Sequence, residues 1–310
     1  MISYRSKQII NVLKCICCIG VVLVHTLFKS INIGKSNLVL DGWGWISFVD
    51  ISNIISRTIV PVFFLISGYL MFLNYRNYSL QWFVAKIKTR IRTLLLPYLI
   101  GIIVYYLFFN LGNIFMSGIM SAGSSHNYNI LTMFWYPLPN AVLWFLRDLM
   151  VVVLLSPIVI KIVNIQKWLI LPVIFVLWFT DIWRFQIPGF SSISFLFFYT
   201  GVFLSIAKID FIEKIHSFKP LNKYLICTLF LTVVLCAFYL KSEYLTKLSI
   251  IAGIPTIIIL SDKICAFERL QSFDFNFWMP ASFFIYVYHV MVEVTIKKTI
   301  FALIIPQSAF

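Results

Sequence analysis

Long apolar runs recur along the whole chain, and most are about as long as a helix that crosses a lipid bilayer. Hydrophobic residues make up 61% of the 310 residues and charged residues only 12%, so no single soluble core can bury this apolar surface. The runs therefore predict an all-α, polytopic membrane bundle of nine or ten helices, with spans near 9–28, 52–73, 93–110, 142–160, 168–183, 190–207, 224–240, 247–261 and 277–296.

The net charge of +14 does not indicate nucleic-acid binding, because the basic residues lie between the apolar runs and not on a soluble domain. With the N-terminus in the cytoplasm, fifteen Lys and Arg residues fall on the cytoplasmic side and seven outside, while Lys14, Arg57 and Arg147 are intramembrane. We therefore expect a cytoplasmic N-terminus and a multi-pass protein of the plasma (inner) membrane in contact with lipid. The first run is too long for a cleaved signal peptide and carries Lys14, so we expect it to be retained.

Residues 1–310 predict one transmembrane domain, because no linker or internal repeat divides them. The chain has no Walker loop, dinucleotide glycine fingerprint, HExxH, GxSxG or CxxC motif. We therefore expect no tightly bound cofactor and no metal. The six cysteines mostly fall in apolar runs and are expected to be reduced. The oligomeric state is left open.

The first span contains a lysine and a histidine eleven residues apart, Lys14 and His25. Eleven steps of 100° bring both side chains back to within about 20° of one face, about 16 Å apart along the axis. Polar side chains in a span are costly unless they face protein or water. A neutral histidine is well suited to take a proton from a hydroxyl, although a histidine hydrogen-bonded within the bundle is an alternative.

Four cations lie two residues apart in the segment that precedes the third span: Lys86, Lys88, Arg90 and Arg92. Such a cluster can bind the phosphates of a cytoplasmic ligand. An anchor that follows the positive-inside rule explains the same pattern.

Further polar residues in the spans are possible supporting residues. Arg147 and Asp148 are sequence neighbours that point about 100° apart on a helix, so they need not pair with each other. A Ser-Gly step permits close helix approach, and a histidine and a glutamate four residues apart can hydrogen-bond as a structural pair. The supporting set is Arg57, Ser67, Gly68, Tyr69, Trp144, Arg147, Asp148, His289 and Glu293.

An external segment, residues 111–141, has no acidic or basic residue except His126. Its aromatic side chains Tyr128, Trp135 and Tyr136 are candidates for contact with an acceptor sugar. An ordinary interfacial loop is an equally good interpretation.

Several short motifs follow one another in a fixed order: Asn11–Lys14 with Gly20–His25, Pro61–Tyr69, Arg92–Tyr98, Leu143–Arg147, Phe197–Gly201 and Ser282–His289. Together they resemble the acyltransferase-3 family of integral membrane O-acyltransferases over almost the whole chain. The resemblance implies an enzyme that moves an acyl group, often acetyl, from cytoplasmic acyl-CoA to a hydroxyl of a surface polysaccharide or other glycan of the cell envelope.

By the same resemblance, His25 corresponds to the essential histidine and Lys14 to its paired basic residue. The acyl donor, acetyl-CoA, is expected at Lys86, Lys88, Arg90 and Arg92. The chain departs from the family pattern at two motifs, because these cations replace an RxxR pair and Pro61 stands where some branches have Asp. The family usually has ten spans, and residues 299–310 are expected to supply about half a span.

Two other classes of function remain open at this point. A transporter or flippase for lipid-linked glycan also places charges along a path through the membrane, although no inverted repeat is visible. A non-catalytic scaffold would not depend on Lys14 or His25.

Overall fold

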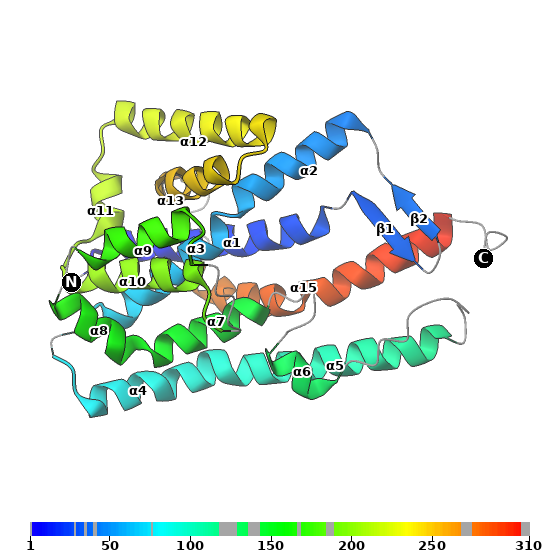
Figure 1. Ribbon diagram of the computed structural model, residues 1–310, viewed down its shortest axis with the longest axis horizontal. Helices are drawn as coiled ribbons and strands as arrows, with labels where there is room; N and C mark the ends of the chain where they lie inside the picture. Colours follow the sequence, from blue (N-terminus) through cyan, green and yellow to red (C-terminus); the bar gives the residue numbers. More distant parts are fainter. Residues whose placement is uncertain are drawn as a thin grey trace.

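The computed structural model describes residues 2–27, 29–33, 36–39, 42–75, 77–117, 129–135, 143–165, 169–183, 189–267 and 275–304. Most helices run along the long axis of the molecule, with the start of α1 and the end of α15 at opposite ends (Figure 1). The elements are α1 (Tyr4–Thr26), β1 (Ser30–Ile33), β2 (Ser36–Val39), α2 (Trp43–Ser56), α3 (Ile59–Phe72), α4 (Leu80–Arg90), the π-helical turn η1 (Ile91–Leu95), α5 (Leu96–Ser117), α6 (Ile130–Trp135), α7 (Leu143–Leu154), α8 (Ser156–Ile165), α9 (Ile170–Phe179), α10 (Ser192–Ile206), α11 (Phe211–His216), α12 (Pro220–Leu240), α13 (Glu243–Ala266) and α15 (Phe275–Ile304).

Five helical stretches are long and apolar enough to cross a membrane: α1, α2 with α3, α4 to α5, α12 and α13. The pair α7 and α8 passes the same test together but is bent by 56°. Three shorter apolar helices, α9, α10 and residues 283–296 of α15, lie at the remaining predicted spans but are below this length. The all-α, polytopic fold is confirmed.

The helix ends differ from the predicted ones at several places. The basic segment before the third span is not a loop, because α4, η1 and α5 follow without interruption from Leu80. Pro157 stands at the start of α8, where proline is tolerated, and it explains why the run predicted as 142–160 bends. The described part of α15 continues to Ile304, so residues 299–304 extend the ninth span and form no separate tenth helix.

The predicted all-helical chain also contains one short antiparallel hairpin, β1 with β2, just after α1. The sequence signal for it was the alternation of polar and apolar residues in Ser30–Ile33, which is typical of a short strand. In Figure 1 this hairpin lies at the same end of the molecule as the end of α15.

Two glycines allow α3 and α10 to cross closely. A Cβ atom on Gly68 would meet the backbone carbonyl of Phe198, and one on Gly201 would meet the carbonyl of Leu65. The Ser-Gly step therefore serves close helix packing, as its sequence indicated.

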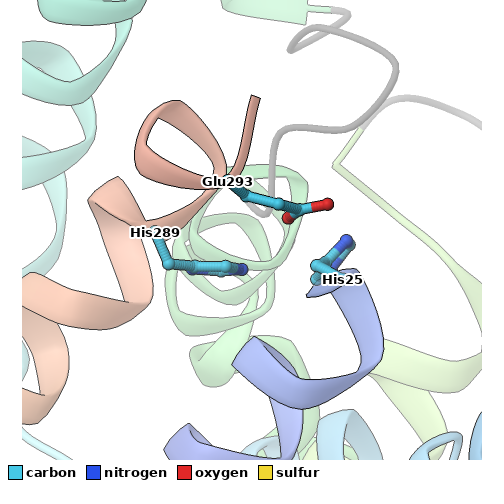
Figure 2. Close-up of side chains that lie close together, drawn as sticks. All are labelled: His25, His289 and Glu293. Carbon is cyan, nitrogen blue, oxygen red and sulfur yellow. The ribbon is translucent and has the colours of Figure 1, made fainter. Parts of the chain in front are cut away.

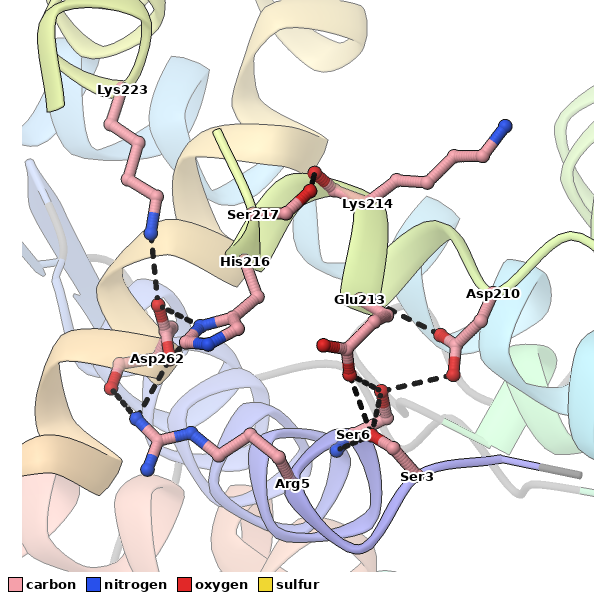
Figure 3. Close-up of polar contacts among 10 residues, drawn as sticks. All are labelled: Ser3, Arg5, Ser6, Asp210, Glu213, Lys214, His216, Ser217, Lys223 and Asp262. Atoms are coloured by element: carbon pink, nitrogen blue, oxygen red, sulfur yellow. Dashed lines mark hydrogen bonds and ion pairs between the residues drawn. The ribbon is translucent and has the colours of Figure 1, made fainter. Parts of the chain in front are cut away.

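The N-terminal end of α1 is tied to α11, α12 and α13 by a polar cluster (Figure 3). The buried carboxylate of Asp262 contacts Arg5 at 2.9 Å, His216 at 2.9 Å and Lys223 at 3.1 Å. On the other side of α1, Ser3 donates a hydrogen bond to Glu213 at 2.6 Å, and Ser6 donates one to Asp210 at 3.0 Å. These contacts fix the end of the helix that carries Lys14 and His25.

Candidate active site

A cavity of about 780 Å³ lies between α1, α3, α4, α7 and α15. Its walls are largely apolar, with Phe63, Phe145 and Tyr286 among them. Three cations line it as well: Lys14 from α1, and Lys86 and Arg90 from α4. An apolar cavity of this size with a few convergent charged groups is typical of a site for a small molecule or cofactor.

The four clustered cations of α4 and η1 divide between two faces of the helix. Lys86 and Arg90 are four residues apart, so they share the face that lines the cavity. Lys88 and Arg92 are exposed and do not line it. The Lys86 ammonium lies 5.8 Å from the centroid of the Trp82 ring, which helps to hold it on its face.

A second group of polar side chains lies farther along α1 and α15. His25, near the C-terminal end of α1, faces His289 and Glu293, which are one turn apart on α15 (Figure 2). The two imidazole ring centroids are 5.3 Å apart, and the ligand-type atoms of all three residues lie within 4.8 Å of one another. We call His25, His289 and Glu293 the histidine–glutamate trio.

The imidazole of His289 has a defined tautomer. Its Nδ1 lies 2.8 Å from the backbone carbonyl of Tyr286 and 3.2 Å from that of Ile285. Carbonyls only accept hydrogen bonds, so Nδ1 carries the hydrogen and Nε2 of the neutral ring is a bare lone pair. Nε2 is buried, and no residue that the structure describes donates a hydrogen bond to it.

The cavity and the trio share the same two helices. Along α1, Lys14 and Cys18 line the cavity and His25 follows about two turns after Cys18. Along α15, Phe283 and Tyr286 line the cavity, and the Tyr286 ring lies 6.4 Å from that of His289. Tyr105 of α5 donates a hydrogen bond at 2.8 Å to the carbonyl of Val287, which fixes α15 between the two sites.

The supporting residues have separate environments. Ser67 lines the cavity and the buried Tyr69 ring packs edge-on against Phe211, at 5.1 Å between centroids. Trp144 is half-buried beside the core. Arg57, at the break between α2 and α3, forms an exposed 2.6 Å ion pair with Glu243.

Arg147 and the buried Asp148 form an ion pair with each other, at 2.8 and 3.0 Å. Their angular separation on the helix does not prevent this pair, because the long arginine side chain bends back to the adjacent carboxylate.

The proposed acceptor contacts are not placed by the structure. Tyr128 and Tyr136 lie outside the described residues, and Trp135 is described only as the last backbone position of α6. Their role remains a prediction.

Sequence reasoning missed several residues that line the cavity. Thr89 and Thr93 share the cavity face of α4 and η1 with Lys86 and Arg90, and Cys18 and Tyr286 contribute from α1 and α15. The helical spacing of 86, 89, 90 and 93 was the available signal. The trio was also missed as a unit, since His289 and Glu293 were interpreted as a pair of their own.

The trio offers two histidine nitrogens and a carboxylate, the donor set that zinc uses in many catalytic sites. It is also a donor set for acid–base chemistry, because it combines neutral imidazoles with a nearby carboxylate. The trio adjoins a cavity with convergent cations, so the arrangement can bind an anionic ligand at one place and move a proton at the next.

Comparison with known proteins gives one match. The model of the family described as "Acyltransferase domain" (acyltransferase-3) matches residues 7–310. No curated protein and no solved structure matches the chain. The family match covers nearly the full length, and the cavity and the trio both lie within it. The chain therefore belongs to the acyltransferase-3 family and is a multi-pass membrane acyltransferase.

Proposed function

We propose that the protein transfers an acyl group, acetyl in the first instance, from cytoplasmic acetyl-CoA to a hydroxyl of an envelope glycan in the plasma (inner) membrane. One observation carries the proposal: the cavity that holds Lys14, Lys86 and Arg90 adjoins His25 along α1 and α15. The cations suit the phosphates of a CoA-type donor. The apolar walls suit its acyl arm.

The N-terminal end of the bundle is assigned to the cytoplasm by the excess of basic residues in the loops on that side. The cavity cations then lie toward the cytoplasm, where acyl-CoA is available. His25 lies about 16 Å farther along α1, toward the outer side. A glycan approaching from outside would reach His25 without crossing the donor cavity.

In the proposed reaction, His25 takes the proton of the acceptor hydroxyl as its oxygen attacks the thioester carbonyl carbon. The new C–O bond forms and the C–S bond breaks, so CoA leaves as a thiolate that takes up a proton. Lys14 contributes a positive charge beside the donor. The family match favours this reaction over transport of a lipid-linked glycan.

The direct test uses membranes from cells with and without the protein. Radiolabelled acetyl-CoA should label the envelope glycan only where the protein is present, and base treatment should release the label as acetate. Membranes with an equal amount of His25→Ala protein are the matched control. Equal labelling in all three preparations would exclude the proposed function.

A further inference from the structure

Nε2 of His289 is buried and accepts no hydrogen bond from any described residue. The side chain is only 7% exposed, and its Nδ1 hydrogen is committed to the carbonyl of Tyr286. A buried acceptor without a donor is costly, so such an atom in a folded protein calls for a specific partner.

The neighbours in the trio do not supply this partner. An ionised Glu293 carboxylate only accepts hydrogen bonds. No hydrogen bond joins His25 to Nε2 of His289 in the described structure, although the rings are near each other. Among the described residues none supplies this donor, which leaves the position to a bound molecule.

The hydroxyl that reacts has one hydrogen, and in the proposed function this hydrogen goes to His25. A second donor is therefore needed for His289. We propose, on the basis of that proposed function, that His289 binds a second hydroxyl of the acceptor next to the reacting one, so that the substrate class is a vicinal diol such as a sugar. His289 is in this view a specificity-determining residue whose protonation does not change during the reaction.

The chemical balance of the transfer is unaffected by this contact. The proton of the reacting hydroxyl moves to His25, the ester C–O bond forms and the thioester C–S bond breaks. The second hydroxyl keeps its hydrogen and donates it to Nε2 throughout. The contact orients the diol and disfavours acceptors that lack the second group, because they leave the buried lone pair unsatisfied.

Three variants separate this role from proton transfer. Glutamine can place its amide oxygen where Nε2 lies, so it accepts a hydrogen bond but does not titrate. His289→Gln should keep acetylation of envelope glycan within about threefold of wild type, whereas His289→Leu should raise the apparent KM for glycan about 10- to 100-fold without changing the KM for acetyl-CoA. His25→Gln should be inactive at both low and saturating concentrations of glycan.

A matched pair of small acceptors tests the second hydroxyl itself. Purified protein in detergent is given labelled acetyl-CoA with propane-1,2-diol or with propan-1-ol. Wild type should acetylate the diol at least about tenfold faster, and His289→Leu should lose that preference. Equal rates with the two alcohols in wild type would overturn the proposal.

The outcomes remain distinct from failure of the proposed function. An active His25→Gln protein would remove the base role of His25, while the contrast between His289→Gln and His289→Leu would still test the hydrogen bond. An inactive His289→Gln protein that inserts normally would overturn the proposal in favour of proton transfer or metal binding. If purified wild-type protein contained stoichiometric zinc and the His289→Leu protein did not, the metal-binding alternative would be correct.

Discussion

The cavity holds its cations on long, flexible side chains from two helices, whereas the trio holds two rings and a carboxylate close together near the far end of α1. In the proposed function Lys86 and Arg90 bind the donor through charge, which tolerates small movements because Coulomb interactions fall off slowly with distance. In the proposed function the trio acts through hydrogen-bond and proton-transfer geometry, which does not tolerate such movements. The proposed donor site should therefore weaken gradually on mutation, whereas loss of the base at His25 should stop the reaction abruptly.

The largest expected effect is at the trio. His25→Ala should lower turnover about 10²- to 10⁴-fold, because no other group would take the hydroxyl proton. Steady-state rates of glycan acetylation, normalised to the amount of membrane-inserted protein, measure this. A rate within tenfold of wild type would show that the trio is not more sensitive to mutation than the cavity.

The next effect is at the centre of the cavity. Lys14→Ala should lose most activity, since it removes a cation that lines the proposed donor cavity from α1. Lys14→Arg should retain it, because the charge stays in place. Assays of both variants at saturating acetyl-CoA separate loss of binding from loss of turnover. If Lys14→Arg were as inactive as Lys14→Ala, the cavity would depend on geometry as the trio does.

The two faces of α4 and η1 provide a matched comparison at the donor site. Lys86→Glu with Arg90→Glu should raise the apparent KM for acetyl-CoA at least about tenfold, more strongly at low salt. Lys88→Glu with Arg92→Glu makes the same change in net charge on the exposed face and should leave this KM nearly unchanged. Similar effects in both double variants would mean that the segment acts as a general positive anchor and not as a site.

The smallest expected effect on the reaction comes from a mutation at the crossing of α3 and α10. Gly201→Ala should lower the melting temperature in detergent, because its Cβ would meet the carbonyl of Leu65. Protein that remains folded should keep its KM for acetyl-CoA, since Gly201 does not line the cavity. A changed KM at an unchanged melting temperature would show that this crossing shapes the donor site directly.

The sequence was sufficient to predict that the apolar runs are helices, because a segment inside lipid has to form its own backbone hydrogen bonds. It was not sufficient for the ends of the helices. The third span was predicted to begin near residue 93, yet nothing between Leu80 and Leu96 interrupts a helix, so the helix already begins at Leu80 and continues into α5.

Predictions for the site divide in the same way. The common face of Lys14 and His25 follows from helical geometry within one span. Helical geometry does not predict which pair of cations in α4 and η1 faces the cavity. The members of each pair share one face, and the packing of neighbouring helices decides which face is turned inward. The contact of His25 with His289 joins residues from opposite ends of the chain, and no local pattern says which spans are neighbours.

The polar cluster at the start of α1 has a consequence for both regions at once. A helix that turned about its own axis by one residue would rotate Lys14 out of the cavity and His25 away from His289 together, by about 100°. Arg5 holds α1 from the side of Asp262, and Ser3 and Ser6 hold it from the side of α11. These contacts set the rotational phase of α1, and so one polar cluster at the start of the helix would align the proposed donor binding with the proposed proton transfer.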